Sequence, residues 1–152
     1  MPRHPCRTPP VPPTVSELLA SLSDRRQRLT RPRRAVIEAL VAAGRPVTVR
    51  ELHAALTGVD LVTVYRTLSW LVEMGVAREV TAVHGAERFE PVDASGHAHH
   101  LHCCRCGRLA STQACGVEPG VFARILREEG FEVADHTLTF HGRCEECRGA
   151  PR

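Results

Sequence analysis

Two pairs of cysteines in the second half of the chain have the spacing of zinc ligands. Cys103 and Cys106 form one CxxC pair, and Cys144 and Cys147 form the other. Each pair can bind one side of a tetrahedral Zn²⁺ ion through its thiolates. Buried free thiols, the plainer interpretation, give no reason for two such pairs in one chain. We therefore predict a structural zinc site with four cysteine ligands.

Catalytic and redox chemistry fit these pairs less well. Glu145 and Glu146 lie inside the second pair, and carboxylates raise a thiol pKa, whereas redox-active pairs need that pKa lowered. A zinc deaminase carries a Glu beside a ligand and a Pro before its CxxC pair, and the run ahead of Cys103 has neither. Four thiolates also leave no position on zinc open to water. The sequence therefore predicts a protein that is not an enzyme.

A second set of ligands is rich in histidine. His97 and His99 alternate along a predicted strand, so their side chains share one face of it. Glu118 at a helix start and His136 on a later strand can converge with them. Three imidazoles and one carboxylate suit Zn²⁺ or Fe²⁺, with Mn²⁺ left open, and the nearby Cys115 slightly favours zinc.

The charge of the chain is unevenly divided. Residues 1–70 hold 11 Arg against 5 acidic residues, a net charge of +6, whereas residues 71–152 hold 9 Arg against 12 acidic residues, a net charge of −3. A basic first half indicates contact with a polyanion such as nucleic acid.

The cysteine content and the start of the chain indicate a cytoplasmic protein. Seven Cys, an odd number, argue against a disulfide framework. No apolar run approaches the roughly 20 residues of a membrane span, so no membrane partner is expected. Residues 1–13 are rich in Pro and Arg, lack the apolar region of a secretory signal, and are predicted to form a disordered arm.

Four helices and a hairpin are predicted in residues 14–90. Apolar residues at helical spacing place a first helix near residues 15–22 and a fourth from Val62 to Met74, with Leu61 pointing inward. Thr30 and Gly44 bound a second helix, and Thr48 caps a third whose buried side includes Ala55. Two strands follow, joined at His84–Gly85, which together with the helices indicates a winged helix-turn-helix domain.

The remaining residues predict a hinge and a small αβ domain. Residues 91–96 are a polar hinge, and strands are expected near 99–103, 108–112, 131–133 and 137–141. A helix opens at Glu118 and ends at Gly130, with Val121, Phe122, Ile125 and Leu126 on its buried side. Such a small unit has few residues to bury, so metal and a partner subunit are expected to stabilise it.

Several motifs together resemble the ferric uptake regulator family. Leu61–Leu68 is similar to the recognition helix of that family with its TVYR core, and Arg28–Arg33 is similar to the start of its second helix. His97–Cys103 resembles its His-rich strand running into the first CxxC pair. Asp135–Leu138 and Gly142–Cys144 are similar to its last strand. The resemblance covers about residues 15–148 in the same order.

This resemblance implies an α+β protein with two functional domains. These are a winged-helix DNA-binding domain at 14–90 and, beyond the hinge, a metal-binding dimerisation domain at 97–148 followed by a tail at 149–152. It implies a homodimer that binds double-stranded operator DNA when loaded with metal, usually as a repressor of metal-uptake or stress genes. A peroxide-sensing member of the family, and a metal-storage or metal-delivery protein that does not bind DNA, stay open as alternatives.

Exposed side chains on the predicted recognition helix suit contact with DNA. Arg66 can bond guanine or a phosphate, the Tyr65 ring can contact a thymine methyl group, and Thr63 lies on the same helix away from its buried face. Arg28 and Arg33 near the start of the second helix suit phosphate contact. A solvated arginine face, with Tyr65 half-buried in the core, is the plainer interpretation of the same residues.

The resemblance also places the metal sites and reveals departures from the family pattern. It implies a regulatory site near the hinge made by His97, His99, Glu118 and His136, where His99 stands in the place of a family carboxylate. It implies a second regulatory site that includes Glu90 and His100. Other ligands of that second site are replaced, by Pro46, Ala98 and Ser111, so it is either lost or rebuilt from neighbouring residues.

Overall fold

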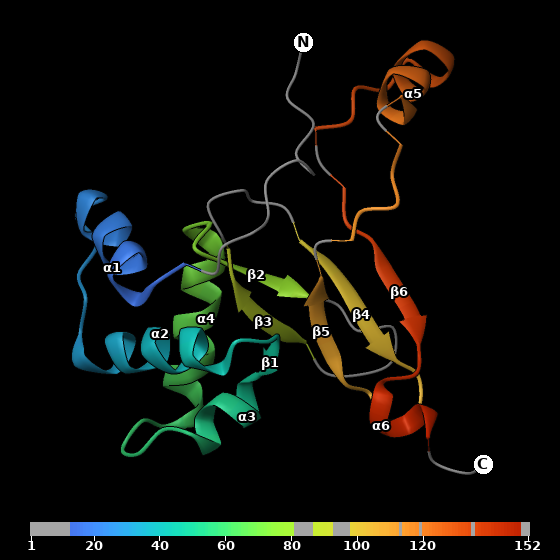
Figure 1. The fold of residues 1–152 in the computed structure, drawn as a ribbon. Coiled ribbons are helices and arrows are strands. Elements are labelled where there is room, and N and C mark those ends of the chain that lie inside the picture. The colour runs from blue at the N-terminus through green and yellow to red at the C-terminus, as the bar shows by residue number, and fades with distance from the viewer. Residues whose placement is uncertain are drawn as a thin grey trace. The chain divides into compact units, whose positions relative to one another are not determined.

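The computed structural model describes residues 13–80, 87–92, 98–112, 114–118, 120–134 and 136–149. The chain forms two compact units, one of residues 11–94 (the first unit) and one made mainly of residues 95–152 (the second unit). Helices and strands are mixed, so the predicted α+β class is confirmed (Figure 1). Within the described residues, no helix is both long and apolar enough to cross a membrane.

Side-chain caps set where the helices of the first unit begin. The helices are α1 (Val15–Asp24), α2 (Arg31–Ala43), α3 (Val49–Ala54) and α4 (Leu61–Glu73). Thr30, Thr48 and Asp60 each accept a hydrogen bond from a backbone N–H of the first turn that follows, and Thr48 forms a capping box with Glu51. Helix α2 ends at Gly44, whose φ of 59° suits a residue without a Cβ.

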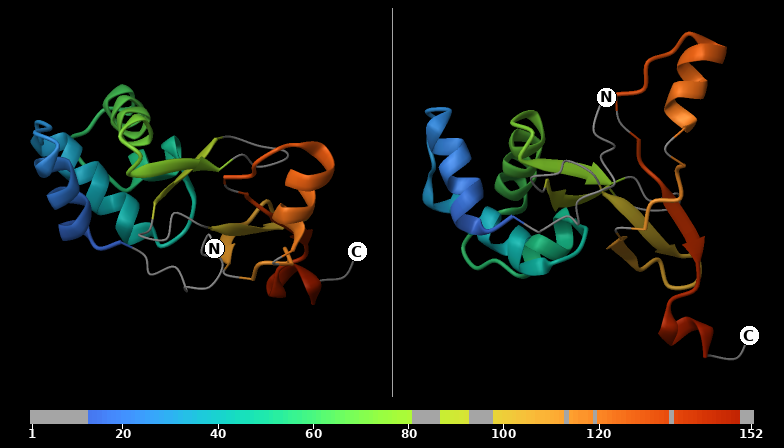
Figure 2. Two further views of the ribbon diagram at one scale, coloured as in Figure 1. Left: turned by 90° about the horizontal axis from the view of Figure 1, so that it is seen from above. Right: turned by 45° about the horizontal axis from the view of Figure 1, so that its top comes forward.

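One aliphatic core holds the first unit together. Helix α2 packs against α1, α3 and α4, and α4 also contacts α3 (Figure 2). Apolar residues three or four positions apart place one side of each helix in the core. The fully or almost fully buried aliphatic residues of the helices are Leu22, Val36, Ile37, Leu40, Leu52, Val64, Leu68 and Leu71. This core fixes which faces of α2 and α4 are left for solvent.

A small antiparallel sheet completes the first unit. Strands β1 (Val47–Thr48), β3 (Arg88–Pro91) and β2 (Ala77–Val80) lie in the order β1-β3-β2, with Glu79 opposite Phe89. Helices followed by this hairpin make the predicted winged-helix arrangement. The turn predicted at His84–Gly85, within 81–86, lies outside the described residues. Of the predicted hinge, Pro91 belongs to β3, and residues 93–96 are likewise outside them.

Two details of the predicted core in the first unit are wrong. Leu61 is 41% exposed, because it is the first residue of α4 and lies one turn beyond the core residues Val64 and Leu68. Ala55 is exposed because α3 ends at Ala54, so Ala55 belongs to the turn that follows. Both errors extend a helical pattern past the point where the core ends.

The second unit is built on a three-stranded sheet in the order β5-β4-β6. Strand β4 (His99–Cys103) pairs antiparallel with β5 (Leu109–Thr112) and parallel with β6 (Thr139–Gly142). A short helix, α6 (Glu145–Arg148), follows β6. The strand predicted at 131–133 is absent from the described structure, and Phe131 there is 65% exposed.

Helix α5 (Val121–Glu129) stands apart from this sheet. Extended segments on both of its sides hold it away from the strands in Figure 1 and in the right-hand view of Figure 2. The predicted buried side is wrong for a single chain, because no residue of α5 is buried and Leu126 is 51% exposed. The helix is nevertheless amphipathic, and Val121, Phe122 and Ile125 on its apolar side are half-buried, with the Phe122 ring centroid 5.1 Å from that of His136. Its apolar side is therefore only partly covered in one chain.

Candidate metal centres and nucleic-acid interface

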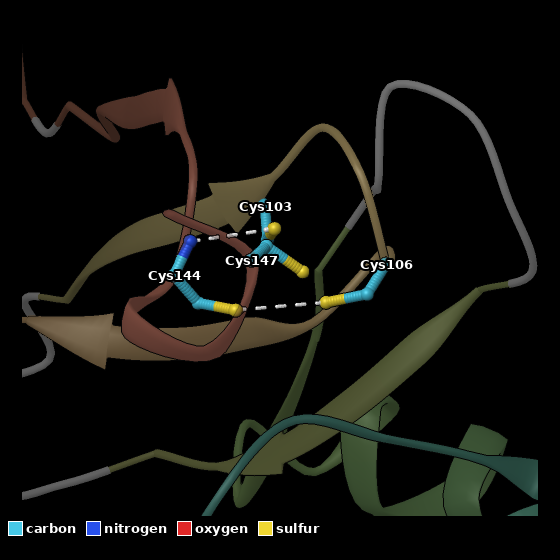
Figure 3. A group of neighbouring side chains, drawn as sticks. All are labelled: Cys103, Cys106, Cys144 and Cys147. Atoms are coloured by element: carbon cyan, nitrogen blue, oxygen red, sulfur yellow. Dashed lines mark hydrogen bonds between the residues drawn. The ribbon is translucent and has the colours of Figure 1, made fainter. Parts of the chain in front are cut away.

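The two cysteine pairs meet in one cluster, as predicted. Cys103 ends β4, Cys106 follows in the turn after it, Cys144 precedes α6, and Cys147 lies in α6. Their four sulfurs lie within 4.8 Å of one another and point inward together (Figure 3). The sulfurs of Cys106 and Cys144 are 3.8 Å apart. Two thiolates on tetrahedral Zn²⁺ with bonds of about 2.3 Å lie roughly 3.8 Å apart, so this four-cysteine cluster fits zinc.

The backbone around the four-cysteine cluster favours thiolates. Hydrogen bonds from the backbone N–H groups of Cys106 and Cys144 lower the pKa of Cys103 to about 5. The Cys144 N–H is 3.4 Å from the Cys103 sulfur. Hydrogen bonds with the sulfurs of Cys144 and Cys106 raise the pKa of Cys147 to about 12. Without a cation, a proton is therefore retained among the sulfurs, and a bound cation takes its place.

A second group joins His99, Cys115 and His136 (the His99 group). Their donor atoms lie within 4.8 Å of one another, and the Cys115 sulfur is 3.3 Å from Nε2 of His136. The rings of His99 and His136 have their centroids 5.0 Å apart. His99 is fully buried on β4, and the Leu138 N–H donates to its Nδ1 at 3.1 Å. A thiol and two imidazoles offer a mixed sulfur and nitrogen site.

This group overlaps only in part with the predicted regulatory set. The structure brings His99 and His136 together and adds Cys115, which the prediction noted only as a neighbour. Glu118 is exposed before α5 and is not in the group, and His97 lies outside the described residues. The sequence did indicate that Cys115 could be a ligand, because it is a lone thiol between two histidine-bearing segments. Its position next to His136 could not be predicted, because Cys115 lies in a loop without regular structure.

Glu90 and His100, the predicted second regulatory set, belong to different units. Glu90 is buried on β3, and its Oε1 lies 3.3 Å from Nε of Arg78. His100 is buried on β4. A carboxylate already paired with an arginine is a poorer ligand for a cation, because the metal has to displace the guanidinium. The second regulatory site stays a prediction.

The predicted DNA-contact residues lie on α4 and near the start of α2. Tyr65 is 51% exposed and Arg66 is also exposed, on the side of α4 opposite its buried residues. The half-buried Thr63 donates its hydroxyl to Asp60 at 2.6 Å, so this hydroxyl is engaged at the helix cap. Tyr65 is therefore not a core residue, which removes the plainer interpretation for that side chain.

Arg28 and Arg33 differ in how freely they can move. Arg28 is exposed, whereas the guanidinium carbon of Arg33 lies 4.0 Å from the centre of the Trp70 ring. Arg33 also donates to the Arg28 carbonyl at 2.9 Å. Arg33 thus ties α2 to α4 through a cation–π contact, and only its remaining donors are left for a phosphate.

Known proteins match this chain over most of its length. The model of the ferric uptake regulator family matches residues 24–141. A ferric uptake regulation protein of Synechococcus elongatus is 29% identical over 141 residues, covering 89% of this chain and 95% of the relative. A peroxide operon regulator of Bacillus subtilis is 31% identical over 137 residues, covering 88% and 92%.

A solved structure agrees with these sequence matches. The ferric uptake regulator of Vibrio cholerae superposes with a TM-score of 0.69 at 25% identity, covering 82% of this chain and 98% of that one. The family match spans both units and includes the first cysteine pair, Cys103 and Cys106. The chain belongs to the ferric uptake regulator family of metal-responsive transcription regulators.

Proposed function

We propose that this protein is a metal-dependent transcriptional repressor that binds operator DNA and controls genes of metal uptake or homeostasis. The observation that carries the proposal is the division of α4 into two sides. Val64, Leu68 and Leu71 anchor it in the core, while Tyr65 and Arg66 face solvent. A rigid helix with a guanidinium and an aromatic ring on its exposed side has the chemistry to enter a major groove. The Vibrio cholerae relative is described as having DNA-binding domains.

The active form in this proposal is a homodimer joined through the second unit. Large apolar side chains of that unit are exposed in a single chain, namely Leu101 (46%), Leu126 (51%), Phe131 (65%) and Phe140 (40%). A second copy of the chain supplies an apolar surface to cover them. Two recognition helices on one dimer then match two half-sites of an operator.

The four-cysteine cluster holds structural zinc in this scheme, and the regulatory ion binds at the His99 group. A neutral imidazole has one nitrogen lone pair that can bind a metal ion. In His99 this lone pair, on Nδ1, accepts the hydrogen bond from the Leu138 N–H. A cation must compete for it, so binding is weaker than at four thiolates, which suits an ion that exchanges. Zn²⁺ fits the thiol of Cys115 best, with Fe²⁺ and Mn²⁺ as alternatives. His97 and Glu118 remain proposed ligands of the same ion.

Metal binding controls DNA affinity by favouring one arrangement of the dimer. His99 is the first residue of β4, and His136 lies just before β6. An ion bound to both would therefore tie the start of β4 to the segment that leads into β6. In this proposal the predicted hinge carries that effect to the DNA-binding unit. Such a switch requires the ion to bind the DNA-competent arrangement more tightly, with a coupling of about 1–3 kcal/mol.

The test is a metal-by-metal measurement of DNA affinity. Duplexes selected from a random pool by the metal-loaded protein serve as the operator, and affinity is measured at fixed salt with Zn²⁺, Fe²⁺ or Mn²⁺ and without added metal. Wild type is expected to gain about 5- to 150-fold with one of these metals. His99→Ala with His136→Ala should keep its structural zinc and lose that gain, whereas His53→Ala, a histidine of α3, should retain it.

Two results would contradict the proposal at different points. Binding to selected and random DNA with equal affinity would remove the operator function and favour metal storage or delivery. A full metal response in the double variant would move sensing to Glu90 and His100. Cys115→Ser, Glu118→Gln and His97→Ala, measured separately, determine which of these residues completes the site.

Peroxide sensing is the second candidate function, because the Bacillus subtilis relative is a peroxide operon regulator and a thiol sits in the His99 group. In that case the Cys115 thiolate attacks hydrogen peroxide, a S–O bond forms, the O–O bond breaks, and hydroxide leaves. Peroxide would then release the metal-loaded protein from DNA, and Cys115→Ser would prevent that release. Release that persists in Cys115→Ser contradicts oxidation of this thiol.

A further inference from the structure

A third group of metal-binding side chains lies on the strands of the second unit, separate from the sites above. It consists of His102, Cys104 and His141 (the His102 group), whose donor atoms lie within 4.8 Å of one another. His102 is buried, whereas Cys104 and His141 are exposed. We propose that this group is an additional, exchangeable site for a thiophilic divalent cation, with Zn²⁺ as the ion it fits best.

The pairing of two strands places these residues. His102 on β4 stands directly opposite His141 on the parallel strand β6, so the two rings project from the same face. Cys104 lies two residues after His102, and because side chains alternate between the two faces of an extended segment, it projects from the same face as His102. Its N–H donates to the Gly142 carbonyl at 2.8 Å, which extends the pairing to this residue. Three donors therefore come from adjacent backbone positions that the sheet already fixes.

The distance between the two imidazoles suits a shared cation. Nδ1 of His102 and Nδ1 of His141 are 3.2 Å apart, and the rings meet edge to face at 79°. Two nitrogens on tetrahedral Zn²⁺ with bonds of about 2.05 Å lie roughly 3.3 Å apart. The two ring nitrogens therefore already have the separation that a shared Zn²⁺ ion requires.

The ligand types determine the class of ion and how firmly it is held. One thiolate and two imidazoles suit Zn²⁺ better than Mg²⁺, Ca²⁺ or Mn²⁺, which prefer oxygen ligands. Three protein ligands leave a fourth position open. Cys104 and His141 are exposed, so water can reach that position. An open site with two exposed ligands exchanges its ion, unlike the closed four-cysteine cluster.

The test isolates the Cys104 thiolate from the other thiols of the chain. The starting protein carries Cys6→Ser and Cys115→Ser with zinc in the four-cysteine cluster, so Cys104 is the one thiol left outside that cluster. Co²⁺ is titrated in, near-ultraviolet absorption of thiolate bound to Co²⁺ is recorded, and released zinc is measured. The expected result is one thiolate-bound Co²⁺ per chain without release of zinc.

Matched variants decide the assignment. Cys104→Ser in that background should abolish the thiolate absorption, and His141→Gln should weaken Co²⁺ binding by at least about tenfold. His53→Gln should change neither quantity. Absorption that survives Cys104→Ser, or that rises only as zinc is released, would overturn the proposal. The absence of thiolate absorption in the starting protein would also overturn it. None of these results depends on whether the His99 group senses metal.

Discussion

The two units of this protein are stabilised in different ways. The first unit buries a continuous set of aliphatic side chains, several of them completely. Among the described residues of the second unit, the buried hydrophobic side chains are Ala98, Cys103 and Leu109, and the buried polar ones are His99, His100 and His102. Aliphatic burial can hold the first unit alone, whereas the second unit has few buried aliphatic side chains, and in the proposed function metal ligands and a second subunit stabilise it.

This contrast also separates their roles in regulation. A unit held by its own aliphatic core does not need metal to keep α4 in place, because Val64, Leu68 and Leu71 of that helix are buried. A unit held by ligands changes its stability and its oligomeric contacts with the metal that is available. This contrast supports the proposal that sensing belongs to the unit with the smaller core and DNA contact to the other.

The largest expected effect comes from removing a ligand of the four-cysteine cluster. Cys144→Ser should release the zinc and unfold the second unit, because structural zinc typically contributes about 10–16 kcal/mol of apparent binding free energy. The dimer should be lost, while the first unit keeps its own thermal transition. Elemental analysis, calorimetry and sedimentation measure these three quantities. Full zinc content with an unchanged melting temperature would exclude Cys144 as a ligand.

The next largest effect is expected in the core of the first unit. Leu68→Ala removes a completely buried side chain and should lower the free energy of unfolding of that unit by about 2–5 kcal/mol. Zinc content should stay unchanged. The control is Val62→Ala on the same helix, which is 56% exposed and should cost less than about 0.5 kcal/mol. Equal losses for both variants would contradict the placement of Leu68 in the core, and a loss of zinc in Leu68→Ala would contradict the independence of the first unit.

A smaller effect is expected from the exposed side of α4. Arg66→Ala should weaken specific DNA binding by about 1–3 kcal/mol and leave both zinc content and melting temperature unchanged. Gel-shift titration at fixed salt measures this loss. Arg28→Ala is the matched comparison, since a phosphate contact should lower affinity for all duplexes about equally and reduce the salt dependence. Unchanged discrimination between operator and random DNA in Arg66→Ala would assign base recognition to another residue.

The smallest effect concerns a helix cap. Thr48→Ala removes the hydroxyl that accepts from the Glu51 N–H at 3.1 Å and should destabilise the first unit by about 1 kcal/mol. Chemical denaturation of the first unit measures it. Thr48→Ser keeps the acceptor and should stay close to wild type. A loss as large with Ser as with Ala would mean that the methyl group of Thr48 contributes more than its hydroxyl.

Local signals in the sequence were enough to predict the first unit. Thr30, Gly44 and Thr48 bound helices because their capping chemistry acts over three or four residues. The four-cysteine cluster was predictable for the same reason, since each CxxC pair is itself a local motif. Leu61 and Ala55 were misplaced because periodicity does not reveal where a core ends.

The convergence of His99 with His136 was predicted, but the His102 group and the place of Cys115 beside His136 were not, because they depend on contacts between distant segments. Cys104 meets His141 through the parallel pairing of β4 with β6, and no short motif encodes that register. Cys115 reaches His136 from a loop. The strand expected at Phe131 failed because an apolar run was taken as a strand, although no neighbouring strand covers it in the described structure.

The stacking of Arg33 on Trp70 has a practical consequence for observing the protein. Trp70 is the chain's one tryptophan and Tyr65 its one tyrosine, and both lie on α4. Intrinsic fluorescence therefore originates entirely in the first unit, and a guanidinium over the indole makes the emission sensitive to the packing of α2 against α4. If the proposed regulation is correct, adding metal to the second unit should change this emission, which would give an optical readout at α4 without an added label.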